Sequence, residues 1–212
     1  MPAPCYADAM ANLRTVIFTG PDITPHLASL ARLRMAVFRE WPYLYDGDPA
    51  YEADYLADFA IAPSAALVVA FDGETAVGCS SCVRLTEEDN AVRAPFIAAG
   101  IAPERVFYFG ESVLLPAYRG TGIGVRFFDE REAHARRVST CDFAAFCAVI
   151  RPDDHKLRPP GAVKLDAFWR RRGFTAYPDL VCQIAWKQVD GAGKVENTLA
   201  FWLKSLTGAA LP

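Results

Sequence analysis

The sequence predicts an α/β (α+β) fold, with a central mixed, mostly antiparallel twisted sheet of about seven strands flanked by four or five helices. Short apolar runs of strand length alternate with longer segments whose apolar residues recur every three or four positions. Asp72-Gly73-Glu74 and Asp190-Gly191-Ala192-Gly193 are typical of hairpin turns between neighbouring strands. The chain has 212 residues, 52% of them hydrophobic, which suffices for a sizeable core. We therefore expect a single domain over residues 1–212.

The expected elements follow one another along the whole chain. Strands are expected at residues 15–18, 66–71, 76–85, 106–115, 143–150, 180–186 and 198–206. Helices are expected at residues 24–41, 51–60, 122–138 and 163–172, with weaker helical character at 90–99. Thr24 and Pro25 are suited to begin the first of these helices, and Gly173 to end the last.

Composition and charge argue against several classes of function. The formal net charge is −3, with both signs mixed along the chain, so we expect no nucleic-acid partner, which usually requires a basic face. No apolar run approaches the roughly 20 residues that span a bilayer. Residues 1–8 lack the basic and apolar stretches of a signal peptide. We expect no membrane association and a cytoplasmic location.

The six cysteines are expected to be small buried side chains rather than a disulfide or metal framework. Cys79 and Cys82 lie three positions apart in a predicted strand, so their thiols should point to opposite faces. No metal site is expected, because the three histidines are widely spaced.

A glycine-rich segment, Arg119-Gly120-Thr121-Gly122-Ile123-Gly124, lies between an apolar strand and the helix that follows it. The first N–H groups of a helix have no internal partner and its dipole adds positive charge, so an anion can bind there. Glycines let a diphosphate approach the backbone. The endings typical of a P-loop and of a dinucleotide fingerprint are both missing. The segment therefore predicts another kind of diphosphate site, or else a structural glycine turn.

Together with the preceding Val113-Leu114-Leu115-Pro116-Ala117-Tyr118, this segment resembles the acetyl-CoA signature of the GNAT superfamily of N-acetyltransferases. Phe168-Trp169-Arg170-Arg171-Arg172-Gly173-Phe174 is similar to the aromatic-x-x-x-Gly-Phe ending of that family's last helix. The resemblance implies a GNAT-like acyltransferase fold with acetyl-CoA as cosubstrate. It implies a coenzyme site made of Val113, Leu114, Leu115, Arg119, Gly120, Thr121, Gly122, Ile123, Gly124 and Trp169.

Glu111 is the leading candidate for a general base. We expect it to share a strand face with Phe107, Phe109 and Val113, where loss of hydration would raise its pKa towards neutrality. The resembling family often carries a catalytic glutamate on this strand, usually further from the loop, and a bulge would restore the direction of the side chain. The alternative is a structural carboxylate or a substrate ligand.

The leaving thiolate needs a proton, and here the resemblance supplies no donor. The family's usual tyrosine acid is replaced by Trp169, whose indole N–H donates a hydrogen bond but no proton. Ser112, Tyr108 or Tyr177 could serve instead, as could water, or the thiolate leaves without help.

The acceptor is expected to be a primary amine of a small molecule or a peptide. Tyr43 and Tyr45 fall where the resembling family has its acceptor-side loop, and His155 follows a strand at the end where α/β proteins place ligands. Tyrosine packing and an exposed histidine are the alternatives.

Two other functions compete with amine acetylation. One is a non-catalytic acyl-CoA-binding module, favoured by Trp169. The other is a hydrolase that uses Cys147 and His155. The sequence leaves the oligomeric state open, and the apolar segment Leu199–Leu203 could pair across a homodimer.

Overall fold

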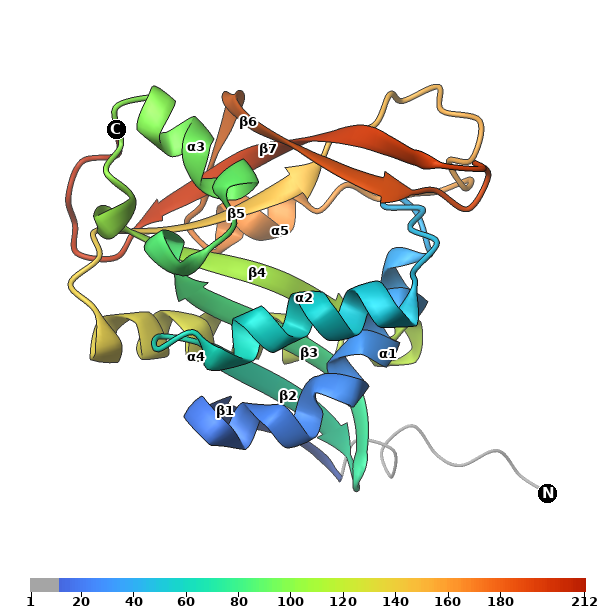
Figure 1. Ribbon diagram of the computed structural model, residues 1–212, viewed down its shortest axis with the longest axis horizontal. Helices are drawn as coiled ribbons and strands as arrows, with labels where there is room; N and C mark the ends of the chain where they lie inside the picture. Colours follow the sequence, from blue (N-terminus) through green and yellow to red (C-terminus); the bar gives the residue numbers. More distant parts are fainter. Residues whose placement is uncertain (1–11) are drawn as a thin grey trace.

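One seven-stranded sheet runs through the protein, whose computed structural model describes residues 12–212 (Figure 1). In spatial order its strands are β1 (Leu13–Thr19), β2 (Ala66–Asp72), β3 (Thr75–Arg84), β4 (Val106–Leu114), β5 (Phe143–Val149), β7 (Lys194–Ser205) and β6 (Thr175–Lys187). All neighbours are antiparallel except β4 and β5, which are parallel. The predicted mixed, mostly antiparallel sheet is confirmed.

Within these residues, five α-helices flank the sheet. They are α1 (Leu27–Phe38), α2 (Pro49–Ile61), α3 (Asn90–Ala98), α4 (Ile123–Val138) and α5 (Asp166–Arg171). In Figure 1, α1 and α2 lie on one face of the sheet and α4 lies on the other. The core packing agrees, because Leu30 and Leu56 pack with Val113, whereas Phe128 packs with Phe109.

Two helices begin later than the sequence predicts. A short 3₁₀-helix, Gly20–His26, precedes α1, so that His26 rather than Thr24 is the residue before its first turn. Pro25 lies inside this 3₁₀-helix, where its ring does not have to fit the i→i−4 hydrogen bonds of an α-helix. The last helix begins only at Asp166, because turns through the Pro-Pro-Gly sequence at 159–161 precede it.

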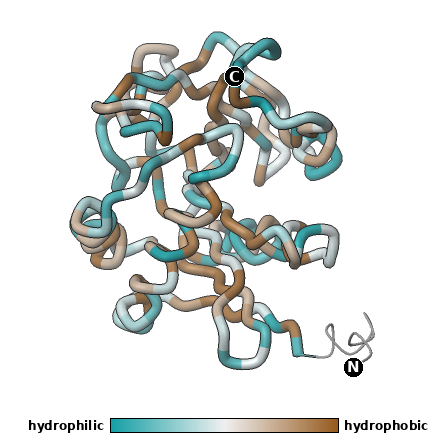
Figure 2. Tube along the Cα trace, turned by 90° about the vertical axis from the view of Figure 1, so that its right-hand side faces the viewer, coloured by the Kyte–Doolittle hydropathy of each residue, from teal (hydrophilic) through white to brown (hydrophobic). Residues whose placement is uncertain are grey.

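Apolar residues are concentrated in the middle of the fold, between the sheet and its helices (Figure 2). Cys79 packs on the side of α1 and α2 and Cys82 on the side of α4, which confirms that their thiols diverge. Both are free, and Cys5 lies outside the described residues. Among residues 12–212, no helix combines the length and apolar character needed to cross a membrane.

β7 does not have the free edge that the expected dimer contact requires. Leu199–Leu203 pairs with β5 on one side and with β6 on the other. The prediction that this segment pairs across a dimer is therefore wrong, because its backbone groups are already used inside the sheet. The oligomeric state stays a prediction.

Candidate active site

β4 and β5 separate part of the way along the sheet. Their parallel ladder consists of three residue pairs, from Val106–Phe143 to Tyr108–Ala145, although both strands continue beyond it. Past Tyr108, the edge of β4 that faces β5 has no strand partner among residues 12–212. Leu115, just after β4, has both of its backbone groups bonded to the protein. An open strand edge binds extended ligands that carry amide groups.

A bulge in β4 lies at the start of this opening, where Gly110 and Glu111 together oppose the single residue Ser81 of β3. A Cβ atom on Gly110 would lie 2.5 Å from Ser81 Oγ. That hydroxyl accepts a hydrogen bond from the Glu111 backbone N–H at 2.9 Å and donates one to Glu111 Oε2. The glycine therefore leaves the space in which Ser81 holds Glu111.

The bulge also changes the face onto which Glu111 projects. Phe109, before the bulge, packs on the side of α4. Glu111 contacts Arg34 of α1 and Tyr55 of α2 on the opposite face. The prediction that Glu111 shares a face with Phe107 and Phe109 is therefore wrong, whereas Val113 does lie on its side. An extra residue in a strand reverses the alternation of side chains, and this is the physical reason.

The glycine-rich segment forms the turn into α4. Gly120 and Gly122 have φ angles of +82° and +88°, in the left-handed region that favours glycine, and Gly122 immediately precedes α4. The backbone N–H groups of residues 120–124 make no backbone hydrogen bond within the described part of the chain. Together with the dipole of α4 they form a site suited to a diphosphate.

Most side chains of this segment turn away from the N–H groups. Thr121 Oγ1 donates to the Tyr118 carbonyl at 2.7 Å. The guanidinium of Arg119 pairs with Glu40 at 2.9 Å, and its backbone N–H donates to Pro116 at 3.1 Å. The backbone N–H of Arg119 is thus engaged, and its guanidinium also donates through Nε to the Leu114 carbonyl at 3.3 Å. Residues 120–124 are the part of the loop whose backbone N–H groups are open.

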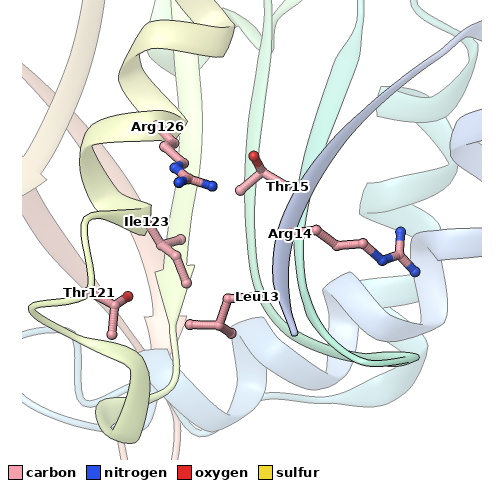
Figure 3. Close-up of a pocket in the computed structure, with 6 residues that line it drawn as sticks. All are labelled: Leu13, Arg14, Thr15, Thr121, Ile123 and Arg126. Carbon is pink, nitrogen blue, oxygen red and sulfur yellow. The ribbon is translucent and has the colours of Figure 1, made fainter. Parts of the chain in front are cut away.

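A small pocket lies between the start of α4 and β1 (Figure 3). It is lined by Leu13, Arg14, Thr15, Thr121, Ile123 and Arg126. In Figure 3, Arg126 lies beside Thr15, whereas Arg14 points away, and its guanidinium lies 4.5 Å from the Phe71 ring centre. Arg126 therefore adds a positive charge in the first turn of α4, close to the open N–H groups.

A buried network of charged and phenolic groups surrounds Glu111. Arg34 donates to Glu111 Oε1 and, through Nε, to Glu52 Oε2 at 2.5 Å. Tyr55 donates to Glu111 at 2.9 Å, and Tyr45 donates to Glu52 at 2.8 Å. The side chains of Arg34, Glu52 and Glu111 are 11%, 0% and 7% exposed. The three charges are therefore held by one another and by phenols, with little help from water.

The pKa of Glu111 is lowered, not raised. Burial by itself would raise this pKa, but the charge of Arg34 and the hydrogen bonds from Ser81 and Tyr55 outweigh burial and lower it. The sequence prediction was wrong because the decisive charge comes from α1, 77 positions earlier in the chain.

Three residues of this centre were missed by the sequence analysis: Arg34, Glu52 and Glu88. Arg34 and Glu52 lie on the apolar stripes of their helices, four positions from Leu30 and Leu56. A charged residue at such a buried position was the available signal. Glu88 follows β3 and is half-buried, and burial, followed by the charge of Glu111, raises the pKa of Glu88 to about 7.

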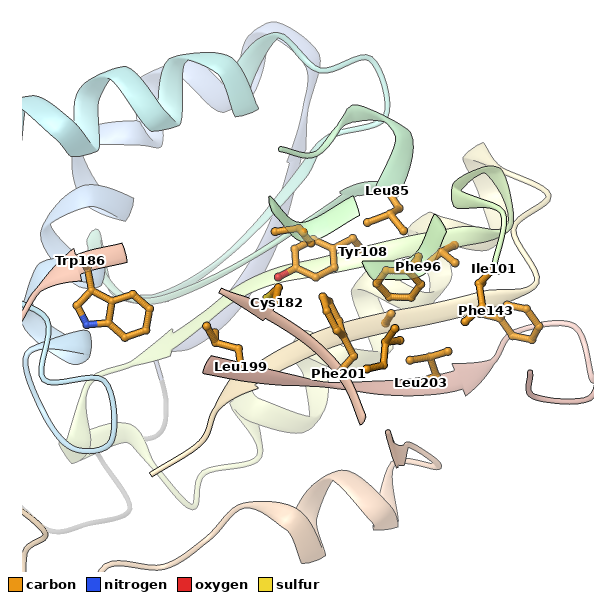
Figure 4. Close-up of a cluster of buried hydrophobic side chains, with 14 of the residues drawn as sticks. Leu85, Phe96, Ile101, Tyr108, Phe143, Cys182, Trp186, Leu199, Phe201 and Leu203 are labelled. Atoms are coloured by element: carbon orange, nitrogen blue, oxygen red, sulfur yellow. The ribbon is translucent and has the colours of Figure 1, made fainter. Parts of the chain in front are cut away.

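The three side chains considered as donors to the leaving thiolate lie in different surroundings. Tyr108 is buried, and Figure 4 shows its hydroxyl turned away from Phe96. This hydroxyl lies 3.1 Å from Cys147 Sγ, near the point where β4 and β5 separate. Ser112 is exposed on β4, next to the bulge. Tyr177 donates to the main-chain carbonyl of Pro212 instead.

Trp169 lies in an aromatic cluster, with its ring centre 5.1 Å from those of Phe146 and Trp202. Its helix borders the start of α4, since a Cβ atom on Gly124 would lie 3.5 Å from the Phe168 ring. The expected neighbourhood of α5 and the glycine loop is present, and the contacts of the Trp169 ring are with the core.

Of the predicted acceptor residues, Tyr45 belongs to the Glu111 network and Tyr43 interacts with it at longer range. Burial, then the charges of Cys147 and Glu111, raise the pKa of the Tyr43 hydroxyl. Tyr45 is buried and its hydroxyl is bound to Glu52. Tyr45 therefore stabilises the network through Glu52 and does not line an open surface.

His155 lies apart from this network. Its ring lies beside that of Trp41, tilted by 56° with centres 5.2 Å apart, and its Nδ1 accepts from the Leu157 backbone N–H at 3.2 Å. Within the described residues it makes no hydrogen bond to Glu111 or to Cys147. The hydrogen bond that the Cys147 thiol donates to Cys182, together with burial, raises the pKa of Cys147. This opposes the hydrolase alternative, because a nucleophilic cysteine needs a thiolate.

An open strand edge, a diphosphate-type helix start and a carboxylate beside them are the parts of a transferase that uses an acyl-CoA. The chain belongs to the acetyltransferase (GNAT) family, whose model matches residues 30–159. The family predicted from the glycine signature is confirmed. Among curated proteins, none has a significantly similar sequence.

Solved structures show the same fold. An acetyltransferase from Streptococcus agalactiae has a TM-score of 0.57 at 16% identity, over 92% of this chain and 99% of that chain. The ribosomal-protein-alanine N-acetyltransferase of Brucella melitensis has a TM-score of 0.58 at 14% identity, over 90% and 99%. The yncA acetyltransferase of Salmonella typhimurium, solved with its cofactor acetyl-CoA, has a TM-score of 0.53 at 16% identity, over 94% and 98%.

Proposed function

We propose that this protein transfers an acetyl or other short acyl group from acetyl-CoA to a primary amine of a small-molecule or peptide acceptor. The observation that carries the proposal is the set of unpaired N–H groups at residues 120–124, beside the open edge of β4. The loop would hold the diphosphate, and the backbone of Leu114 would hold the amide-bearing arm. The backbone groups of Val113, like the N–H of Leu115, point to β3, because alternate residues of an antiparallel strand face the same neighbour. The acetyl-CoA in the similar Salmonella typhimurium protein supports this choice of donor.

Glu111 has room for one more hydrogen bond. An ionised carboxylate offers about four acceptor positions. Arg34 and Tyr55 use two on Oε1, and Ser81 uses one on Oε2. The remaining position on Oε2 is proposed to accept an N–H from the acceptor amine, or an O–H from a bridging water.

The lowered pKa of Glu111 is compatible with proton transfer. When the neutral amine attacks the thioester carbon, the new C–N bond leaves a positive and strongly acidic nitrogen. A carboxylate of low basicity can take that proton, so Glu111 acts as the base after attack and not before it. The C–S bond then breaks, and Ser112 or Tyr108 donates a hydrogen bond to the departing thiolate, which takes its proton from solvent.

Calorimetric titration with acetyl-CoA tests the donor site. We expect the wild type to bind and a Gly122→Trp variant to lose binding, because an indole would cover the N–H groups. Gly193→Trp, in the exposed β6–β7 turn, is the matched control and should bind normally. Absence of binding to the wild type would contradict the proposal.

Release of free thiol with a panel of amines tests the reaction. Glu111→Gln should lower kcat by about 10²–10⁴-fold, the usual contribution of a positioned base, with unchanged affinity for acetyl-CoA. A non-catalytic acyl-CoA-binding module, favoured by Trp169 at the family's tyrosine position, would bind acetyl-CoA and release no thiol with any amine. We also propose that residues 1–212 form a single domain and that the protein is cytoplasmic.

A further inference from the structure

We propose that Arg34 and Glu52 are positioning residues for acetyl transfer: they hold the Glu111 carboxylate ionised and in a fixed direction, and they join it to the loop that carries Tyr43 and Tyr45. The catalytic meaning of this inference rests on the proposed function. The contacts that support it are independent of that function.

Arg34 is held so that its donors cannot change direction. Its guanidinium lies 4.7 Å from the Tyr55 ring centre and 5.4 Å from that of Phe38. Nε donates to Glu52 while Nη1 donates to Glu111. The guanidinium is planar, so its orientation is fixed once Nε is bonded to Glu52 and the group lies over two aromatic rings. The direction of Nη1 is then fixed as well. The position of Glu111 Oε1 follows from it.

Glu52 completes the network from the other side. It is fully buried, and a buried carboxylate is tolerated only when it is paired and hydrogen-bonded. Arg34 supplies the charge and Tyr45 supplies a hydroxyl donor. Two carboxylates thus share one guanidinium, so that Glu52 holds Arg34 in place for Glu111.

The same network reaches the predicted acceptor-side loop. The Tyr45 backbone N–H donates to Phe38 at 2.8 Å, and the Tyr43 carbonyl accepts from Arg151 at 3.0 Å and from Trp186 at 3.1 Å. The loop is therefore fixed at its backbone and joined to Glu111 by the path Tyr45–Glu52–Arg34. A displacement of the loop should therefore move the Glu111 carboxylate, and a displacement of Glu111 should move the loop.

Arg34 is the cation in direct contact with Glu111. The titratable groups that interact with Glu111 from the elements packed around it are Arg34, Tyr43, Tyr55, Cys79, Glu88 and Arg131. Of the two arginines, Arg131 lies between the Phe109 and Phe128 rings on the α4 side and reaches the Ser81 carbonyl at 3.5 Å. Removal of Arg34 should therefore leave burial as the dominant influence on Glu111.

Carbon-13 NMR titration of labelled glutamate carboxyl groups tests the inference without any turnover. Glu111→Gln identifies the Glu111 signal. We expect Arg34→Gln to raise the pKa of Glu111 by about 1–3 units, the usual effect of a close opposite charge, and Arg34→Lys to raise it less. Arg105→Gln, which breaks the exposed Arg105–Asp142 pair, is the control and should leave that signal unchanged.

Kinetics test the consequence for transfer. With a responsive amine, Arg34→Gln should move the acidic limb of kcat/KM upward by the same amount, with unchanged KM for acetyl-CoA. In a Glu111→Gln background, the same substitution should produce no further loss of kcat. Arg34→Gln with Glu52→Gln removes one charge of each sign and serves as the variant to measure if the single variant unfolds.

Two results would overturn the inference: an unchanged Glu111 pKa in the variants without Arg34, or independent losses of kcat from Arg34→Gln and Glu111→Gln. A wild type that releases no thiol with any amine would instead count against the proposed function, and the NMR titration would still decide whether Arg34 holds Glu111 ionised.

Discussion

Replacement of Gly110 by alanine should disturb Glu111 through one added methyl group. The new Cβ would lie 2.5 Å from Ser81 Oγ, inside van der Waals contact, but 3.8 Å from Ser81 Cβ, where contact is ordinary. The hydroxyl must therefore move, and it makes two hydrogen bonds to Glu111. A neutral hydrogen bond contributes about 1 kcal/mol and a charge-assisted one about 1.5–3 kcal/mol, so we expect a loss of about 2–4 kcal/mol in the free energy of unfolding.

Urea denaturation followed by circular dichroism measures this loss. Gly124→Ala is the matched control, because its Cβ would meet Phe168 at an ordinary 3.5 Å and alanine favours a helix. Ser81→Ala removes the displaced hydroxyl, so Gly110→Ala should cost little more in that background. An equal cost of Gly110→Ala with and without the Ser81 hydroxyl would refute the reasoning, because the clash would then not be the cause.

Three further outcomes are expected. Gly122→Ala places a Cβ at φ +88°, which costs about 1–2 kcal/mol and should weaken acetyl-CoA binding about 5–30-fold by calorimetry, while Gly124→Ala binds normally. The pKa of Glu88 is about 7 in the folded protein and 4.5 for an ordinary glutamate, so its contribution to stability is lost as pH rises between these values. Glu88→Gln should therefore raise Tm at pH 8 and leave it nearly unchanged at pH 4, and an equal change at both would contradict this. If the Tyr108 hydroxyl donates to the thiolate, Tyr108→Phe should lower kcat by about 10²-fold with unchanged KM for acetyl-CoA. If Ser112 donates instead, Ser112→Ala should show that loss. Stopped assays of Tyr108→Phe and Ser112→Ala identify the donor.

The glycine-rich turn into α4 could be predicted from the sequence because its determinants are local. An apolar strand, two glycines in left-handed conformations and a helix start all lie between residues 106 and 138. Each is governed by the backbone preferences of a few neighbouring residues. Family membership followed from the same stretch.

The state of Glu111 could not be predicted in this way. Its direction depends on an extra residue in β4 relative to β3, and its pKa depends on a guanidinium from α1. Both the direction and the pKa are set by how distant segments pack. The residues next to Glu111 in the sequence do not indicate that Arg34 contacts it. The same limit applies to Leu199–Leu203, whose apolar pattern is equally compatible with a free edge and with its true place between two strands.

The short ladder between β4 and β5 has a mechanical consequence. Within the sheet, three residue pairs join β1 to β4 on one side to β5, β7 and β6 on the other, and α4 lies in the covalent link from β4 to β5. Outside the sheet, the loop after α1 also bonds to β6. A molecule seated in the gap would bridge both parts of the sheet and brace them against bending. If that molecule is acetyl-CoA, as proposed, its binding would make the reacting centre more rigid, and this rigidity would be lost when CoA leaves.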